Sequence, residues 1–331
     1  MPYQPGVGEV HIDFALTNFS LAYMQDEGSF VADKVFPIVP VDHKSNKYFK
    51  YPKDTFLRAG GEKASFGNLP PMTGLNLTSD NYNADIWRWG VMLTPDVRAN
   101  ADAALASIDQ QVAMLVTKGL LIQREVQWGS TYFTTSVWGT DKTGGTDFTR
   151  WDDQTGSDPI SDVLNGKATI LENTGMEANT LTVGYKVHQA LIQHPMILER
   201  IKYGGGPANP AMVTEQMLAQ LFGVEKYIVA KSVQATNAEG QTVSTAFVLG
   251  KHALLTHSAR APGLLTPSAG YNFVWSKLTG NNSLGVATYR TPMPWLGQTA
   301  NGSVELIEGN YAYDMKATAS DLGYFWSGAV A

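Results

Sequence analysis

The segment AALASIDQQVAMLVTKGLLIQREVQW, residues 103–128 of a chain of 331 residues, decides the architecture. Its apolar residues recur at spacings of three and four, which is the pattern of a helix with one buried stripe. At ~1.5 Å per residue this helix would be about 39 Å long. Asn100 and Asp102 are residue types that cap helix starts. Gly119 costs about 1 kcal/mol relative to alanine, so we expect tight packing there. The predicted stripe contains Leu105, Ile108, Val112, Leu115, Val116, Leu120, Ile122 and Val126.

The chain before this helix is extended but unsuited to the middle of a sheet. The run VFPIVPV at residues 35–41 has two prolines three positions apart. Proline lacks the amide donor that a central strand needs. We therefore predict that this run is an extended arm lying against a surface, either of this chain or of another.

Residues 43–93 alternate polar and apolar side chains around a middle rich in glycine and proline. This pattern predicts a long hairpin with strands at 48–51 and 84–91. Each limb of ~20 residues would reach roughly 60 Å, whereas a compact chain of this length has a radius of gyration of about 20 Å. Such a hairpin must protrude, and because an isolated hairpin is marginally stable it needs a neighbour.

The rest of the chain predicts a compact α/β region followed by closing strands. Helices are expected at 158–175, 187–193 and 214–222, and strands at 180–183, 227–230 and 246–249. Strands return at 286–290, 304–307 and 311–315. The fold class is therefore α+β.

Charge and cysteine content exclude several function classes. Charged residues make up only 16% of the chain, and the net charge is −6. Since an ordinary domain has roughly 25% charged residues, we expect partners to cover much of this surface. The negative charge argues against sequence-specific nucleic-acid recognition. The absence of cysteine excludes disulfides, thiolate metal sites and cysteine nucleophiles. No signal-peptide pattern and no run of ~20 apolar residues occurs, so we expect cytosolic synthesis and no membrane partner.

Motifs that carry catalysis are missing from the sequence. There is no phosphate-binding Gly-x4-Gly-Lys-Ser/Thr loop and no Gly-x-Ser-x-Gly elbow. His188 and His194 are six positions apart, which does not suit a metal pair on a helix. Asp152 and Asp153 could supply an acid and a base, but a loop pair of this kind is usually solvated. We expect no catalytic residue, no cofactor and no metal.

Several stretches, in order along the chain, resemble the Hong Kong 97-type major capsid proteins of tailed bacteriophages. They are LTNFSLAY (16–23), FVADKVFPIVPV (30–41), RANAD (98–102), HP (194–195), IKY (201–203), LFGV (221–224) and GKHALL (250–255). The resemblance implies a capsid fold with an N-terminal arm (1–42), an extended loop (43–95), a peripheral domain with the long helix as its spine (96–155), an axial α/β domain (156–282) and closing peripheral strands (283–331).

The resemblance also implies a structural function without catalysis. The chain would assemble with itself, as hexamers and pentamers, into an icosahedral virion shell around double-stranded DNA that is held non-specifically. Assembly would take place in the bacterial cytoplasm, with portal, scaffold and decoration proteins as further partners. Because Met1 directly precedes the arm, we expect no long scaffolding segment in this chain. Apolar side chains on the arm and hairpin are the interface candidates, namely Phe30, Val35, Phe36, Ile38, Val39, Tyr48, Phe49, Tyr51, Phe56, Trp87 and Trp89.

Some family members join subunits by a Lys–Asn isopeptide bond. Lys44, Lys47, Lys50, Lys53 and Lys63 lie in the corresponding loop. No partner asparagine or catalysing glutamate can be matched, so this activity is not carried over.

Two other functions stay open at the level of sequence. An encapsulin-like nanocompartment would share the fold and enclose a protein cargo. A glycan-processing enzyme or glycan-binding module would fit a chain rich in glycine and aromatic residues and free of cysteine. The first differs in particle contents, and the second predicts a discrete pocket in a monomer.

Overall fold

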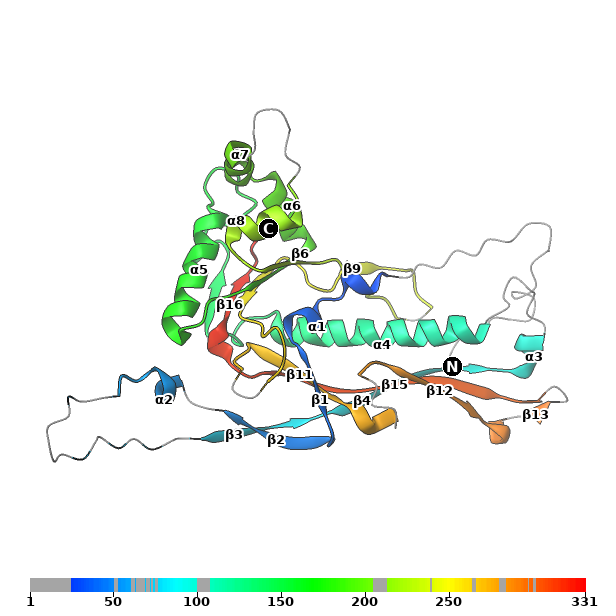
Figure 1. The fold of residues 1–331 in the computed structure, drawn as a ribbon. Helices are drawn as coiled ribbons and strands as arrows, with labels where there is room; N and C mark the ends of the chain where they lie inside the picture. The colour runs from blue at the N-terminus through cyan, green and yellow to red at the C-terminus, as the bar shows by residue number, and fades with distance from the viewer. Residues whose placement is uncertain are drawn as a thin grey trace.

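A computed structural model describes most of the chain. The described residues are 25–50, 53–60, 63, 69, 72, 74, 77–99, 108–204, 213–238, 240–263, 266–279, 284–296, 298–299 and 302–331. Figure 1 shows an elongated molecule in which one long helix lies along a sheet, other helices gather over a second sheet at one end, and a hairpin extends away from the body. Among the described helices, none has the length and apolar composition of a membrane span.

The first sheet is built around one long strand, β15 (Glu305–Ala317). Its partners are β4 (Asp85–Leu93), β11 (Gly270–Trp275) and β12 (Ala287–Pro292), all antiparallel to it. Because β4 and β12 both pair with residues 305–310, they lie on opposite sides of β15. Strand β1 (Ile38–Val41) joins β11 in parallel at the edge of this sheet. The proline-rich run is therefore an edge strand, which confirms the prediction that it cannot be a central one.

The long helix α4 (Ile108–Tyr132) crosses this sheet and contacts β15 and β4. Val112, Val116 and Leu120 are buried against Leu93 and Ile307, so this part of the predicted stripe is confirmed. Leu115 was predicted to be in the stripe, but its side chain is 49% exposed, so that assignment is wrong. Residues 100–107, which include Leu105 and the expected caps, lie outside the described residues.

Two glycines allow the helix and the sheet to approach closely. A β-carbon added at Gly119 would overlap the ring of Trp89 on β4, and one added at Gly309 would lie 2.6 Å from Val116. The second glycine also explains a wrong prediction. The segment around Gly309 was expected to separate strands 304–307 and 311–315, but β15 is continuous there because the strand must pass directly beneath α4.

The second sheet has the order β5–β16–β10–β6–β7. Its strands are β5 (Thr140–Thr143), β6 (Thr180–Gly184), β7 (Lys226–Ala230), β10 (Ala253–Thr256) and β16 (Gly323–Ser327). Around it lie α5 (Pro159–Thr174), α6 (Tyr185–Gln193), α7 (Pro195–Gly204) and α8 (Glu215–Phe222). As predicted, α5 starts with proline after the Asp158 cap, and it ends at Gly175 in the left-handed conformation (φ 71°).

Strand pairing joins segments that the predicted division of the chain assigns to different parts. β5 and β16 come from segments assigned to the peripheral domain, yet both pair within the α/β sheet. Conversely, β1 from the arm and β11 from the axial segment belong to the sheet beneath α4. Hydrogen bonding between strands distant in sequence decides these memberships, and no local pattern reports it.

Among the described residues, three two-stranded ladders lie outside these sheets. They are β2 (Ser45–Lys50) with β3 (Thr78–Asn83), β8 (Val233–Ala235) with β9 (Thr245–Phe247), and β13 (Gln298–Thr299) with β14 (Gly302–Ser303). The ladder of β2 and β3 is the projecting hairpin, and α2 (Lys53–Leu57) lies beyond β2. The predicted second limb at 84–91 is instead β4, which pairs with β15 in the body. The described hairpin ladder is therefore shorter than expected.

A single large core joins both sheets to the arm. Phe36 lies among aromatic side chains of the end of α4 and the turn after it, with ring centroids 4.8 Å from Tyr132, 5.8 Å from Trp128 and 6.3 Å from Trp138. Burying one such ring stabilises the fold by ~1.5–3 kcal/mol. The described part of the arm thus contributes to this chain's own core.

The contact of Gly119 with Trp89 can be tested by adding one methyl group. In an exposed helix, Gly119→Ala would stabilise by about 1 kcal/mol. Here we expect the free energy of unfolding to fall by about 1–3 kcal/mol, because the methyl group overlaps the Trp89 ring. Urea denaturation followed by circular dichroism measures the change. In the background Trp89→Ala the same substitution should cost nothing, and an equal loss in both backgrounds would contradict the assigned contact.

Candidate subunit-contact surfaces

The arm is fixed to α4 by a buried carboxylate. Both oxygens of Glu125 accept hydrogen bonds from the amide of Val31 (3.0 and 3.1 Å), and one also accepts from the amide of Ala32 (3.1 Å). These amides begin the short helix α1 (Ala32–Val35), which has no side-chain cap of its own. Glu125 therefore caps α1 from a distant part of the chain. Burial raises the pKa of Glu125, and the two amide donors oppose that rise.

A second buried charge completes this contact. Arg124 forms an ion pair with Asp33 of α1 (2.7 Å) and donates a hydrogen bond to the hydroxyl of Tyr311 on β15 (3.1 Å). The side-chain amide of Asn272 on β11 donates to Asp33 (3.2 Å). This buried polar network, defined here as Arg124, Glu125, Asp33, Asn272 and Tyr311, connects the arm, α4 and the first sheet.

Sequence reasoning missed Arg124 and Glu125 because charged residues indicate the solvent side of a helix. A usable signal was present. The buried positions Val112, Val116 and Leu120 are spaced by four, and continuing that spacing leads to Arg124 and then Trp128.

The structure corrects part of the predicted arm interface. Phe30 is 5% exposed, and Val35 and Phe36 are fully buried within a single copy of the chain. A side chain with no accessible area left gains nothing from a neighbouring molecule, so these three are core residues. Ile38 and Val39 on β1 are half-buried and keep some area for a contact.

We expect Glu125→Ala to lower the free energy of unfolding by about 2–4 kcal/mol. The substitution leaves two buried amide donors of α1 without an acceptor, and each unsatisfied donor costs about 1–3 kcal/mol. Chemical denaturation of the subunit measures the loss. Glu27→Ala is the matched control, since Glu27 joins the same arm to Lys118 through an exposed ion pair and should matter by less than about 1 kcal/mol. Equal losses in the two variants would contradict the role of Glu125.

The hairpin is held to the body at its base and is exposed further out. Tyr82 and Tyr48 stack on Phe273 of β11, with ring centroids 4.7 and 5.3 Å away. Across the ladder, Lys50 pairs with Asp80 (2.9 Å), which also accepts a hydrogen bond from the Tyr48 hydroxyl (3.1 Å). Tyr48, an interface candidate, is therefore partly used within the chain.

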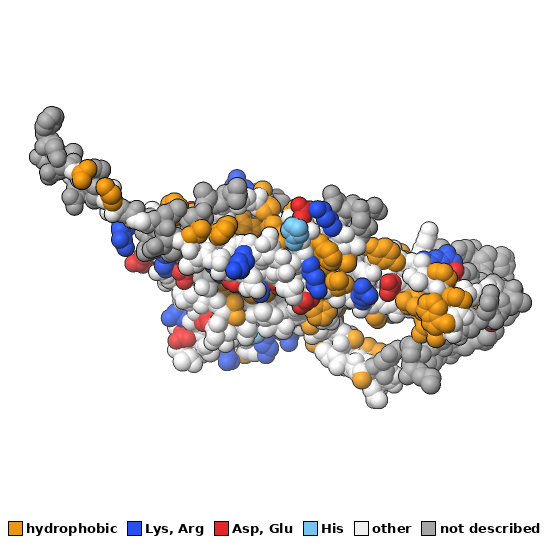
Figure 2. All heavy atoms as spheres, turned by 90° about the horizontal axis from the view of Figure 1, so that it is seen from below, with side chains coloured by type: hydrophobic (Ala, Val, Ile, Leu, Met, Phe, Trp, Pro, Cys, Tyr) orange, Lys and Arg blue, Asp and Glu red, His pale blue; other side chains and the backbone are white. Residues whose placement is uncertain are grey.

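Apolar side chains on the outer hairpin are strongly exposed. Phe49 on β2 is 66% exposed, Phe56 on α2 is 63% exposed, and Leu57 beside it is 55% exposed. The space-filling view in Figure 2 shows hydrophobic side chains on this projecting segment and again at the opposite end of the molecule. Tyr51 lies outside the described residues. The outer hairpin is therefore an apolar surface that its own chain leaves accessible.

The two tryptophans of β4 differ in exposure. Trp87 is half-buried and stacks on Tyr313 with centroids 6.0 Å apart, so it belongs to the core. Trp89 packs one side of its ring on Gly119 but remains 44% exposed. Of these two candidates, Trp89 has more area left for a neighbour.

Other exposed apolar side chains were not predicted. Trp295 (73%) and Leu296 (53%) lie on the short helix η4 (Pro294–Leu296), and Val243 (77%) lies in the turn between β8 and β9. Their signal in the sequence was an apolar residue within a turn-rich segment.

Acidification should weaken the hairpin ladder. The hydrogen bond from Lys50, with that from the Asn81 amide, lowers the pKa of Asp80 from 3.8 to about 2. Because the pKa of Asp80 is lower in the folded state than in the unfolded state, its ion pair stabilises the fold at pH values above the unfolded-state pKa. This stabilisation is lost as the pH falls through the folded-state pKa. At pH 5 we expect the free energy of unfolding of the wild type to be higher than that of Asp80→Asn, by less than about 1 kcal/mol.

The measurement for Asp80 is the difference in unfolding free energy between the two proteins across the acid range. This difference should shrink to zero between about pH 4 and pH 2. A difference that stays constant over this range would contradict the assigned ion pair.

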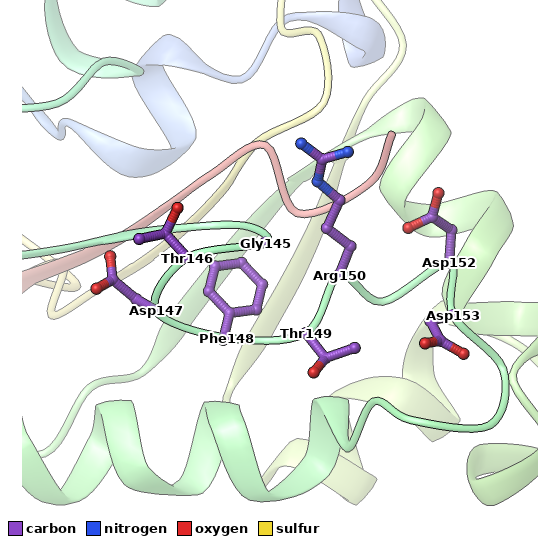
Figure 3. Close-up of a pocket in the computed structure, with 8 residues that line it drawn as sticks. All are labelled: Gly145, Thr146, Asp147, Phe148, Thr149, Arg150, Asp152 and Asp153. Carbon is purple, nitrogen blue, oxygen red and sulfur yellow. The ribbon is translucent and has the colours of Figure 1, made fainter.

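A hollow of about 690 Å³ is lined by the loop 145–153 and has no convergent chemistry. In Figure 3 the carboxylates of Asp152 and Asp153 point in different directions. Asp152 accepts from the Ala331 amide (2.9 Å), whereas Asp153 accepts from the backbone of Thr155 and Gly156. These bonds lower the pKa of Asp153, which makes it a poor proton donor. The described residues contain no group of His, Asp or Glu that could hold a metal ion.

Comparison with known proteins finds similarity over nearly the whole chain. The major capsid protein of Burkholderia phage BcepMu is 22% identical over 318 residues, which is 96% of each chain. No protein-family model matches the chain.

Solved structures share the fold. A phage-related protein from Bordetella bronchiseptica RB50 has a TM-score of 0.66 at 20% identity, over 92% of this chain and 93% of its own. The capsid of cyanophage P-SCSP1u has a TM-score of 0.60 at 12% identity, over 98% of this chain and 95% of its own. The SrpI encapsulin of Synechococcus elongatus PCC 7942 has a TM-score of 0.55 at 11% identity (95% and 93%). The chain thus has the mixed α+β fold of the Hong Kong 97-like capsid proteins.

Proposed function

We propose that this chain is a major capsid protein, which assembles with copies of itself into the icosahedral head shell of a tailed phage. The likeness to the BcepMu capsid protein over 96% of both chains supports this function. The structural observation that carries it is the hairpin, whose base packs on β11 while its outer apolar side chains are left to a neighbour. The protein acts by association and is a component of the virion, and no catalytic step is assigned to it.

The contact residues follow from burial. A side chain can contribute to assembly only if its own chain leaves it accessible, so we assign Phe49 and Phe56 as the main apolar contacts of the hairpin. Trp89, Ile38 and Val39 are secondary contacts, with Tyr51 retained from the sequence. Burying one such side chain contributes ~1.5–3 kcal/mol before ordering costs, so a few contacts repeated around each subunit support a closed shell.

We propose that the chain consists of an extended loop, a peripheral part and an axial part, with boundaries that follow the observed sheets. The extended loop is the β2–β3 hairpin with the residues between them. The peripheral part is α4 with the sheet of β1, β4, β11, β12 and β15. The axial part is the second sheet with α5–α8, and its copies would meet around five-fold and six-fold axes as pentamers and hexamers. Portal, scaffold and decoration proteins are the expected further partners.

The shell would enclose double-stranded DNA without recognising its base sequence. The net charge of −6 provides no dense basic surface for counterion release, so affinity for DNA as such should be weak. Confinement within the shell would retain the genome.

An encapsulin-like compartment is the second candidate, because the SrpI encapsulin shares the fold over 95% of this chain. Particle contents separate the two functions. Particles purified from phage-producing cells should contain nuclease-resistant double-stranded DNA and no stoichiometric second protein inside. A folded enzyme in place of DNA would favour the compartment.

Phe49→Asp should prevent closed particles while leaving the subunit folded. The side chain is 66% exposed, so the unfolding free energy should change by less than about 0.5 kcal/mol. Loss of a buried contact should raise the critical concentration for assembly at least about tenfold, which corresponds to about 1.4 kcal/mol per subunit. Sedimentation velocity and negative-stain microscopy measure particle formation.

Val243→Asp is the matched control, because Val243 is 77% exposed on a different hairpin. Normal particles from Phe49→Asp would overturn the assignment of the outer hairpin as a contact. Deleting residues 1–42 is a poorer test, since it removes Val35 and Phe36 from the core and would unfold the subunit.

A further inference from the structure

A groove of about 820 Å³ runs along the open side of β7, the last strand of the second sheet. Its lining includes Tyr227, Ile228 and Val229 of β7, Ala219 of α8 on one wall and Pro37 of the arm on another. The three β7 side chains are each less than 9% exposed. The accessible part of the strand is therefore mainly its backbone edge.

Within the described residues, this backbone edge has no partner. β7 pairs in parallel with β6, and the amide of Lys226 donates a hydrogen bond to the carbonyl of Asn179, just before β6. No other described segment forms a ladder with β7. An edge strand with free amides and carbonyls in a groove is the geometry that accepts an added strand.

The charges left in the groove favour an acidic strand. Two acidic residues of its lining are already paired, Glu225 with Arg260 (2.5 Å) and Glu215 with Lys231 (2.9 Å). Asp33 is paired with Arg124. The remaining charged side chains of the lining are Lys34, Lys226 and Asp26, and neither lysine has an ion pair with a described carboxylate.

The chain itself arrives at this groove. The side chain of Gln25 accepts a hydrogen bond from the amide of Val233 (2.9 Å) and donates one to its carbonyl, three residues after the end of β7. Asp26, the next residue, lines the groove. Gln25, the first described residue, therefore lies close to the open edge of β7.

The first 24 residues, which lie outside the described residues, contain a segment with the pattern of a strand. In EVHIDFAL, residues 9–16, the apolar Val10, Ile12 and Phe14 alternate with the polar Glu9, His11 and Asp13, and the apolar Ala15 and Leu16 end the segment. This period of two is typical of a half-buried strand. The two carboxylates of the segment complement Lys34 and Lys226. The eight residues 17–24 could span up to ~27 Å, more than the ~17 Å length of β7.

We propose that residues 9–16 of the same chain add to the open edge of β7 as a sixth strand of the second sheet. Apolar side chains of the segment would face the walls of the groove, and its main chain would pair with Lys226–Ala230. The inference goes beyond shell formation and does not depend on it. It adds a second anchor to the arm, beyond the buried polar network at α1.

Cysteine pairs test this placement in the full chain, which has no cysteine of its own. Ala219→Cys in the groove wall is combined, one at a time, with cysteine at each of positions 10–14. A disulfide requires Cα atoms within about 7 Å, and side chains of a strand alternate between its faces. We expect intramolecular disulfides at every second position and a loss of cross-linking at the positions between.

The outcomes of the cross-linking are distinct on a non-reducing denaturing gel. An alternating intramolecular pattern supports the proposal. Covalent dimers would overturn it, because the strand would then come from a second copy. Uniform or absent cross-linking, equal to that of the control pair with Val243→Cys in place of Ala219→Cys, would also overturn it.

Hydrogen exchange gives a second measurement that leaves the groove unchanged. Ile12→Pro removes an amide donor from the middle of the segment, and Gln4→Pro is the control outside it. The amides of Lys226–Ala230 that face the groove should exchange at least about tenfold faster in Ile12→Pro than in Gln4→Pro. Equal exchange in the two variants would overturn the proposal even if both fold normally.

Discussion

The capping of α1 by Glu125 is the contact on which the rest of the subunit depends. The carboxylate comes from the C-terminal half of the long helix and accepts hydrogen bonds from the first amides of a helix of four residues. So short a helix has little stability of its own. Once it is fixed, Phe36 enters its aromatic surroundings and β1 reaches the edge of the first sheet. One buried carboxylate therefore helps to position the chain from Val31 to β1.

This anchoring changes how subunit contacts are understood. An apolar arm and an apolar hairpin look alike in sequence, since both are extended segments with many apolar side chains. In the folded chain, the large apolar side chains Phe30, Val35 and Phe36 of the described arm are buried in the core, whereas those of the outer hairpin are exposed. Under the proposed function, association therefore relies mainly on the outer hairpin rather than on the described arm.

The close approach of α4 to the first sheet depends on two glycines. Gly119 on the helix and Gly309 on β15 remove side chains at the two positions where the elements come nearest. Trp89 and Val116 occupy the space that results. The long helix and the long strand are therefore in direct contact along this face.

The sequence by itself determined the elements: the period of the long helix, the α/β alternation after residue 158, the caps of α5 and the edge position of the proline-rich strand. These depend on local spacing and backbone chemistry. Only the tertiary structure decided that Arg124 and Glu125 are buried, that β4 pairs with β15, and that β5 and β16 join the second sheet. The reason is physical, because the cost of burying a charge or opening a strand edge depends on which distant segment supplies the partner.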